Sequence, residues 1–463
     1  MIESDAGVPR PPFDFDAEDA ALLDEVQRAA FAFFWDGATP GTGLIRDRSG
    51  HDTVSVAGIG FGLSALPIGV ERGWITRDEG GARARLILTT LLDEPTNRKA
   101  GLYYHFLNPD GTPRRIGTEL VVSTIDSAIL FSGAIVACEY FGGDVGALAD
   151  RMLAEADWSF FVNDDAHDEY ARGFISLGWR PTSDADPTGP GSLLPYSWID
   201  SGDEHRLATV MGVIAPTESH RVDPALYYRL RREVGWHDPD GELVWFPYSG
   251  ALFTALFSHC WIDYAHFGAD DPAARGMAHR ARVDWWENTR RTIHLHRDKA
   301  IANPLGLPTL GPDAWGLSAC DGPDGYLVPG LFPEPVKMLD AQAGRDYPVF
   351  KAKDDWGDGV VPPYAAASAI AFEPELALRA MRHYRSLESP DGSPLVWRGL
   401  DAGGFGFVDS FRTGETPWHG DETVAIDQGP MLLLIENART GLIWRLFGAH
   451  PAVDAGFRAL GFR

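Results

Sequence analysis

The chain has 463 residues, which is enough for one large domain or two modest ones with a sizeable buried core. Asp and Glu outnumber Lys and Arg by 66 to 40, so the formal net charge is −26 and a nucleic-acid partner is disfavoured by charge repulsion. The 3 Cys residues are far apart in the sequence and fit neither a disulfide framework nor a CxxC metal site, so no metal and no cofactor are expected.

The N-terminal segment, residues 1–16, is rich in proline and is predicted to lie as an arm on the surface. It has neither a basic n-region nor an apolar h-region, so we expect no signal peptide and a cytoplasmic location. If a leader had been trimmed away, the alternative is a periplasmic location. The sequence has no uninterrupted apolar run of about 18 residues or more, so we expect no membrane span and no membrane partner.

Apolar residues at helical spacing predict helices along the rest of the chain. The first covers residues 17–35. The second covers residues 55–70, is apolar on all sides and is therefore predicted to be buried, and its stretch Gly58–Gly62 is expected to allow close helix packing. Further helices are predicted over residues 82–94, 123–141, 145–162, 203–214, 223–233, 250–267, 272–297, 364–386 and 423–447.

Strand signals are few and short, at Ile175–Gly178, Leu243–Pro247 and Phe405–Val408. About a dozen helices joined by long loops predict an all-α fold in which six inner and six outer helices form a double ring, an (α/α)6 toroid. We expect residues 17–463 to form this toroid as a single domain, and two helical domains divided near residue 300 are the alternative.

Aromatic residues are abundant, with 15 Trp, 13 Tyr and 25 Phe. A Trp side chain offers a large apolar face and one N–H donor, which suits stacking on a sugar ring, although core packing explains any single Trp equally well. Taken together, the Trp residues in loops favour a sugar-binding cleft. These residues are Trp179, Trp198, Trp245, Trp315, Trp356, Trp397 and Trp418.

Carboxylic acids beside aromatic or glycine-rich turns are the candidate catalytic groups, because the sequence has no phosphate-loop, dinucleotide, HExxH or GxSxG motif. Glu119 and Asp126 lie near the start of a buried helix. Helix-terminal charge placement accounts well for Glu119 and less well for Asp126. Glu204 lies where an aromatic loop meets an apolar helix, a setting that can raise the pKa of a general acid. Asp200 and Asp203 compete with it, and one of the three is expected to cap the helix.

Asp409 and Asp427 are further candidates, since both lie at junctions between a turn and a regular element beside apolar residues. Glu436 lies deeper in a helical run and is interpreted as a structural carboxylate bonded to backbone groups.

The composition of the segment that holds Asp321 and Asp324 suggests calcium, but the spacing of the two residues lacks the twelve-residue pattern of a calcium loop. We therefore predict a turn there, with Trp315 and Tyr326 as aromatic residues that contact sugar.

From about residue 17 to the C-terminus, the chain resembles the bacterial glycoamylase-like family. That family includes endo-β-1,2-glucanases and exo-acting enzymes that release sophorose, and the chain is also similar to the transglycosylating domain of cyclic β-1,2-glucan synthases. The segments that begin at Trp315 and Asp427 are the most specific. The segments that carry the resemblance are STIDSAIL, FSHCWIDY, WGLSACDGPDGY, VVPPYAAASAIAFEPE, GFGFVDSF and IDQGPMLLLIENARTGLIW.

The resemblance implies an (α/α)6 toroid that hydrolyses β-1,2-glucan or β-1,2-glucooligosaccharides with inversion and without a cofactor. Glu204 matches the general acid of the family. By position the base falls on Asp409, with Asp427 as the second choice, and Asp126 matches a substrate-binding carboxylate with Glu119 beside it. The remaining substrate contacts are expected at Trp179, Trp198, His259, Trp315, Tyr326, Tyr364 and Trp418.

The chain departs from the family pattern in three places. It shows no export signal, which favours imported oligosaccharides as substrates. The residues before and around the candidate acid read SGDEH, where the family has a more aromatic approach. Residues 331–356 resemble an insertion, which we expect to lie over the cleft as a lid.

Other functions stay open on the sequence. The same scaffold suits a transglycosylase, a retaining glycosidase or an exo-glycosidase for another β-glucan. A sugar epimerase or isomerase would use histidines, of which His205, His220, His259 and His294 are available. A sugar-binding protein without activity would keep the Trp residues and need no acid at position 204.

Overall fold

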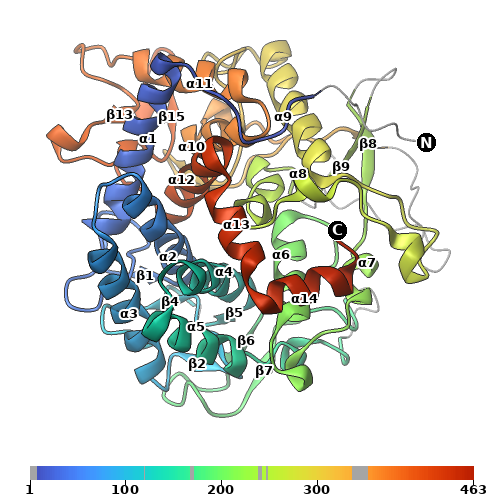
Figure 1. Cartoon of the computed structure of the whole chain (residues 1–463). Coiled ribbons are helices and arrows are strands. Elements are labelled where there is room, and N and C mark those ends of the chain that lie inside the picture. The colour runs from blue at the N-terminus through green and yellow to red at the C-terminus, as the bar shows by residue number, and fades with distance from the viewer. Residues whose placement is uncertain are drawn as a thin grey trace.

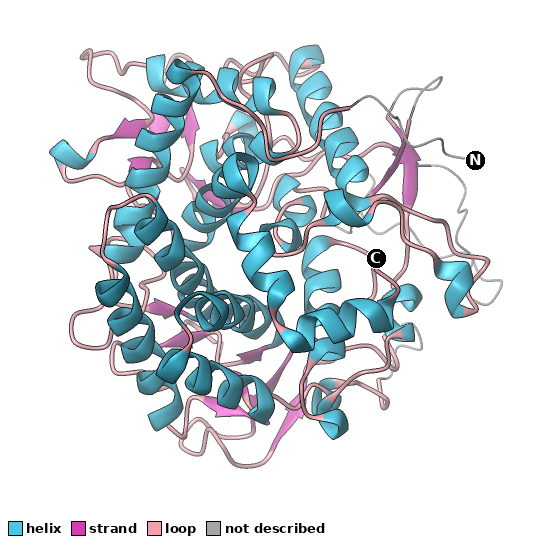
Figure 2. Ribbon diagram, viewed as in Figure 1, coloured by secondary structure: helices cyan, strands magenta, loops and turns pink. Residues whose placement is uncertain are grey.

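The computed structural model describes residues 8–118, 120–166, 171–237, 242–246, 249–335 and 353–462. Helices dominate, and the strands are short pieces near the periphery (Figure 2). The α-helices are α1 (Ala17–Trp35), α2 (Val56–Glu71), α3 (Arg77–Asp93), α4 (Thr124–Phe141), α5 (Gly143–Glu155), α6 (Asp203–Ile214), α7 (Ala225–Arg229), α8 (Tyr264–Phe267), α9 (Trp285–Ala302), α10 (Pro363–Ser368), α11 (Pro374–Ser386), α12 (Ala425–Thr440), α13 (Leu442–Ala449) and α14 (Pro451–Leu460).

The strands form small antiparallel sheets of two or three strands. The pairs are β1 with β4, β2 with β3, β10 with β11, β13 with β14 and β15 with β16, and the three-stranded sheets are β5–β6–β7 and β12–β8–β9. Their bounds are β1 (Val54–Ser55), β2 (Arg98–Lys99), β3 (Leu102–Tyr103), β4 (Phe106–Leu107), β5 (Val122–Ser123), β6 (Gly178–Pro181), β7 (Gly191–Leu193), β8 (Val234–Trp236), β9 (Leu243–Trp245), β10 (Cys320–Gly322), β11 (Gly325–Leu327), β12 (Glu334–Pro335), β13 (Trp397–Arg398), β14 (Gly406–Phe407), β15 (Phe411–Arg412) and β16 (Trp418–His419).

Successive helices follow one another around the molecule, as the colours of Figure 1 show. Helices α6, α4, α2, α12 and α10 pack in that order, each against the next, while α1, α3 and α5 cover α12, α2 and α4 from outside. The buried apolar residues, from Leu23 to Phe462, form one contiguous core.

Glycine permits the closest helix contact, between α2 and α4. A Cβ on Gly60 would lie 2.2 Å from the carbonyl oxygen of Ile129, and one on Gly133 would lie 2.0 Å from the carbonyl oxygen of Gly60. Neither position therefore tolerates a side chain. This confirms the prediction that the glycines of the second helix serve close packing.

Helix α4 is long and apolar enough to cross a membrane by length and composition alone, which the sequence analysis did not anticipate. In the structure 78% of this 18-residue window is buried. Neighbouring helices α2, α5 and α6 pack against α4, so its apolar surface serves the protein core.

Two helices begin in the same way, directly after a short strand that ends in serine. Ser55 Oγ accepts a hydrogen bond from the Gly58 amide at 3.1 Å at the start of α2, and Ser123 Oγ accepts one from the Asp126 amide at 3.3 Å at the start of α4. The paired strands thus fix the N-terminal ends of both helices, and Ser123 is the cap of α4.

Several predicted helices have the expected extent, and others are shorter. The predictions for residues 17–35 and 203–214 agree with α1 and α6. The prediction for 145–162 is too long, because α5 ends at Glu155. Helix α3 begins earlier than predicted, since Thr76 and Glu79 form a capping box ahead of it.

Proline and glycine interrupt the remaining long helices that the sequence predicts. The range 423–447 splits into α12 and α13 at Gly441, whose φ of 66° ends the first helix. The range 272–297 begins instead with a 3₁₀ turn that stops at Gly276, and α9 starts only at Trp285. The range 250–267 is also wrong, since it consists of the 3₁₀ turns η3 (Leu252–Ala255) and η4 (Ser258–Cys260) followed by α8.

Candidate active site

Glu204 lies in the first turn of α6 and is half-buried. Burial is the main cause that raises its pKa, to about 7, and the neighbouring carboxylates Asp126 and Asp203 add to the shift, while His205 opposes it. Glu204 therefore keeps its proton close to neutral pH, which is the state that a general acid requires.

The start of α6 is anchored by its other charged residues. Asp203 forms a buried ion pair with Arg206 and accepts a hydrogen bond from the Ser258 amide at 3.0 Å. The Nδ1 atom of His205 lies 2.7 Å from Oδ1 of Asp200. The residue at the cap position is Gly202, so the prediction that one of the three acids caps α6 is wrong.

Asp126 lies in the first turn of α4 and is only 5% exposed. Its Oδ1 is 3.5 Å from Nε2 of His105, and the ring of His105 stacks on Phe106 with ring centroids 3.8 Å apart. The starts of α4 and α6 are also joined directly, because the indole N–H of Trp198 donates to Thr124 Oγ1 at 2.8 Å. The structure thus brings Asp126 and Glu204 together from two adjacent helices.

Asp409 and Asp427 form a second pair of carboxyl groups. Asp409 is 2% exposed and its Oδ2 accepts hydrogen bonds from the Asp321 amide and the Ser410 hydroxyl, both at 2.8 Å. Asp427 lies in the first turn of α12, and its Oδ2 accepts no hydrogen bond from any described residue. Burial foremost, then the charge of Asp409 and a hydrogen bond to it, raise the pKa of Asp427 well above its ordinary value. Asp427 therefore holds its proton more firmly than an isolated aspartate does.

Arg48 lies beside this pair and was missed by the sequence analysis. Its Nη1 is 3.0 Å from Oδ2 of Asp321 and 3.0 Å from Oε2 of Glu422. Arg48 precedes α2 in a turn that carries no recognisable motif, and Asp321 was predicted only as a turn residue, so no sequence signal joined them. The guanidinium partly offsets the negative charge around Asp427.

The hydroxyl of Tyr326 is affected by the charges of both groups of acids. It lies on β11 directly opposite Asp321, and 66% of its surface is exposed. Burial of its hydroxyl and the charges of Asp427, Asp409 and Glu204 raise its pKa. Tyr326 is therefore near enough to Glu204 and to the aspartate pair for the charges of all three acids to act on its hydroxyl.

Tyr364 and Trp418 also lie beside the aspartate pair. The hydroxyl of Tyr364, on α10, is 2.9 Å from Ser318 Oγ, and the charge of Asp427 contributes to raising its pKa. Trp418 is half-buried on β16, the strand that pairs with β15 next to Asp409. The half-buried position of Trp418 suits the predicted substrate contact, whereas Tyr364 is 3% exposed and belongs to the core, which corrects that prediction. Glu119 lies outside the described residues.

Three other predicted sugar contacts belong to the core, which corrects that part of the prediction. Trp179 is 1% exposed, with Lys99 over its ring at 4.8 Å. His259 is fully buried, hydrogen-bonded to Thr289 and packed on aromatic residues, and burial holds its pKa well below the ordinary value. Trp315 is also fully buried. A Trp in a loop packs between turns and helices as readily as it faces a cleft, so its sequence context does not separate the two roles.

Glu436 is structural, as predicted, although its partners are side chains rather than backbone groups. It is 1% exposed and receives hydrogen bonds from Arg72 at 2.8 and 2.9 Å and from Gln27 at 2.9 Å. The predicted lid, residues 331–356, lies largely outside the described residues.

Comparisons with known proteins concern the family and the fold of the chain. The sequence profile of the glycoamylase family, described as "Putative glucoamylase", matches residues 195–451. A curated relative from Parabacteroides distasonis, named exo beta-1,2-glucooligosaccharide sophorohydrolase (non-reducing end), is 25% identical over 483 residues. The alignment covers 96% of this chain but only 58% of that relative, so the chain spans little more than half of its length.

Solved structures share the fold along nearly the whole chain. A "putative glucoamylase" from Bacteroides uniformis has a TM-score of 0.76 and 27% identity, with 96% of this chain and 98% of that chain covered. An endo-beta-1,2-glucanase from Chitinophaga pinensis, solved with sophorotriose and glucose, has a TM-score of 0.75 and 24% identity over 96% and 98% of the two chains. Because the family profile matches more than half of the sequence, including Glu204, Asp409 and Asp427, this chain belongs to the glycoamylase family.

Proposed function

We propose that this protein is a glycoside hydrolase that cleaves β-1,2-glucosidic bonds in β-1,2-glucan or β-1,2-glucooligosaccharides with inversion of configuration. The observation that carries the proposal is Glu204, a half-buried acid with a pKa of about 7 in the first turn of α6, beside Asp126 and with Tyr326 near both it and the aspartate pair. The β-1,2 linkage is proposed from the names of the Parabacteroides relative and the Chitinophaga structural neighbour.

In this proposal Glu204 is the general acid. It donates its proton to the oxygen of the leaving sugar as the bond from that oxygen to the anomeric carbon breaks. A water molecule attacks the same carbon from the opposite face, and its proton passes to a carboxylate on that side. In inverting enzymes the acid and base carboxyls are typically about 6.5–9.5 Å apart.

Asp409 is the proposed base, in preference to Asp427. The Asp321 amide and the Ser410 hydroxyl both donate to Asp409 Oδ2 and hold this carboxylate in one orientation, whereas the pKa of Asp427 is raised well above its ordinary value. Asp427 then holds a proton and donates a hydrogen bond to Asp409, which further fixes the orientation of the base. Arg48, through Asp321, keeps the amide that supports Asp409 in place.

We propose further that residues 17–463 form one catalytic domain with the (α/α)6 toroid. The packing order of α6, α4, α2, α12 and α10 supports an inner ring. The 3₁₀ turns η3 and η4 contact α6, and η4 also contacts α12, so they take the place of a sixth inner helix. Sugar units would then lie across the starts of these helices, against Asp126, Trp198, Tyr326 and Trp418.

The test is incubation with linear and cyclic β-1,2-glucans and with sophorose-series oligosaccharides, followed by chromatography of the products. Release of shorter β-1,2-linked sugars is expected, whereas β-1,3-glucan, β-1,4-glucan and starch should stay intact. Products longer than the substrate would instead indicate transglycosylation. Absence of any change in all β-1,2-linked substrates would contradict the proposal.

A further inference from the structure

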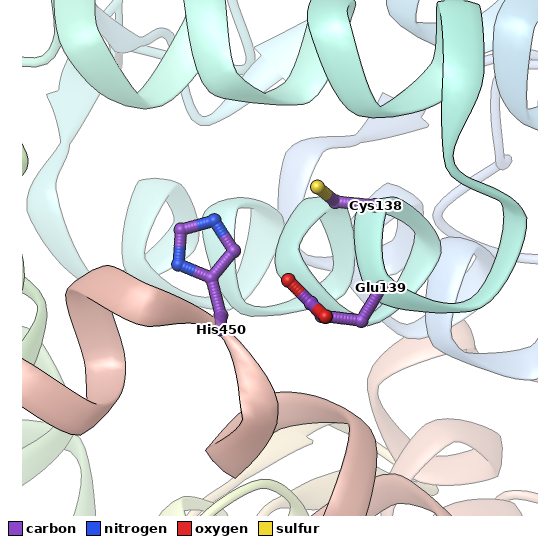
Figure 3. A group of neighbouring side chains, drawn as sticks. All are labelled: Cys138, Glu139 and His450. Atoms are coloured by element: carbon purple, nitrogen blue, oxygen red, sulfur yellow. The ribbon is translucent and has the colours of Figure 1, made fainter.

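A cluster of potential metal ligands lies at the end of α4 remote from the candidate active site. Cys138 and Glu139 come from the last turn of α4, and His450 lies at the junction of α13 and α14 (Figure 3). One ligand atom of each residue lies within 4.8 Å of the others. The sequence analysis predicted no metal site, since Cys138 belongs to no cysteine motif and the three residues come from two distant segments.

Asp150 of α5 lies beside two members of this cluster. Its Oδ1 is 3.3 Å from Nε2 of His450 and 4.0 Å from Sγ of Cys138. In a tetrahedral zinc site with bonds of about 2.0–2.3 Å, neighbouring ligand atoms are roughly 3.3–3.7 Å apart. The two distances to Asp150 are therefore already close to those of a zinc site.

The local electrostatic field also favours a cation. Helix α4 ends at this cluster, whereas α13 ends and α14 begins at His450, so the dipoles of these two helices oppose one another; neither α4 nor α13 has a basic residue in its last turn. Within the described parts of the chain, neither Glu139 nor Asp150 forms an ion pair with a lysine or an arginine. The two carboxylates are thus left without a fixed positive charge.

We propose that Cys138, Glu139, Asp150 and His450 bind a zinc ion that ties α4 and α5 to the junction of α13 and α14. A ligand set of sulfur, nitrogen and oxygen suits Zn²⁺ better than Mg²⁺ or Ca²⁺, which prefer oxygen alone.

The ion would be structural and would take no part in the proposed hydrolysis. Cys138 is twelve residues from Asp126 along α4, which corresponds to about 18 Å at the helical rise of ~1.5 Å per residue. The inference is therefore independent of the proposed function, and either can fail without the other.

The experiment uses the full chain, stripped with a chelator and then loaded with Zn²⁺ or Co²⁺. We expect about one zinc per chain after dialysis, a rise in the melting temperature with Zn²⁺, and for Co²⁺ the intense absorption of a thiolate-bound tetrahedral ion. Cys138→Ser and His450→Asn should each abolish the cobalt band. In His450→Asn the new side chain can still cap α14, as the side chain of His450 does, because asparagine is a favoured helix cap.

Cys320→Ser is the control, because it removes another buried thiol from a distant hairpin and should keep the cobalt band. A protein that binds no zinc after chelator treatment would overturn the inference. Zinc or cobalt binding that persists unchanged in both Cys138→Ser and His450→Asn would overturn it as well, because the ion would then occupy another place.

Discussion

Buried acids in two regions of this molecule differ in whether a lysine or an arginine forms an ion pair with them. Buried acids that only hold structural elements together, which we call framework acids, pair with arginines. Asp203 pairs with Arg206, and Glu436 receives two hydrogen bonds from Arg72 at 2.8 and 2.9 Å. At the starts of α4, α6 and α12, no lysine or arginine of the described chain forms an ion pair with Glu204, Asp126, Asp409 or Asp427. Arg48 approaches this region but pairs with Asp321 and Glu422.

This difference separates structural acids from candidate catalytic ones. A buried carboxylate is costly to ionise unless a partner neutralises it, so the fold supplies arginines where the acid only holds helices together. The acids of the candidate site have no such partner, and burial raises the pKa of Glu204 to about 7 and that of Asp427 well above its ordinary value. Acids left in this state are able to exchange protons with a substrate.

The largest expected effect is that of Glu204→Gln. The substitution removes the acidic proton and keeps the size of the side chain, so turnover of β-1,2-glucooligosaccharides should fall by roughly 10²–10⁴-fold while the substrate still binds. Initial rates and isothermal titration with the same oligosaccharide measure the two effects.

Glu233→Gln is the matched control. The pKa of Glu233 is also raised to about 7 by burial, but Glu233 is an acid of the framework, 2.9 Å from Arg231. We expect this variant to keep most of its turnover. An equal loss of turnover in both variants would show that any buried glutamate of high pKa matters, and the comparison of the two regions would fail.

The next effect distinguishes the two aspartates. Asp409→Asn removes the proposed base, so we expect a fall in kcat of at least about 100-fold. Asp427→Asn replaces a carboxyl group that is already protonated with a neutral group of the same shape, and its amide can still donate to Asp409, so a fall of less than about 10-fold is expected. A reversed order in the measured kcat values would move the base to Asp427.

Loss of an arginine that pairs with a framework acid should lower the stability of the protein and leave its activity unchanged. Arg72→Met leaves the carboxylate of Glu436 buried without its ion pair, which should lower the free energy of unfolding by about 3–5 kcal/mol. Urea denaturation gives this value, and the activity per folded molecule should stay unchanged. A change below about 1 kcal/mol would indicate that the pair is dispensable.

The smallest expected effect is on stability, because Glu204 is ionised at high pH without a positively charged partner. Because the pKa of Glu204 is higher in the folded protein than its ordinary 4.5, the folded state loses stability as the pH rises from about 4.5 through about 7. Glu204→Gln should therefore be more stable than the wild type at pH 8, by roughly 1–3 kcal/mol, and equal to it at pH 4. Melting curves at both pH values measure the difference, and a destabilised variant at pH 8 would contradict it.

The sequence predicted the helical class and the positions of the strongly periodic helices. The starts of α4 and α6 followed from polar residues next to apolar runs, and the glycines of α2 followed from their place in a buried helix. The errors came at residues 250–267 and 272–297, where composition is helical but proline, glycine and tertiary packing break the backbone into 3₁₀ turns and loops.

The candidate site was predictable in part. Glu204, Asp409 and Asp427 were found because acids beside apolar runs are conspicuous and because the chain resembles a known family. Arg48 and His105 were missed, since their importance depends on contacts with residues 321 and 126, which only the folded chain brings near. Trp179 and Trp315 were misassigned for a similar reason, because burial is a property of the fold.

The most direct test of the central claim is NMR of the sugar anomers during the first minutes of hydrolysis of β-1,2-glucooligosaccharides. The account predicts that the wild type produces the α-anomer first and that Glu204→Gln produces almost no new reducing ends. Initial appearance of the β-anomer would contradict inversion. Undiminished product formation by Glu204→Gln would contradict the assignment of Glu204 as the acid.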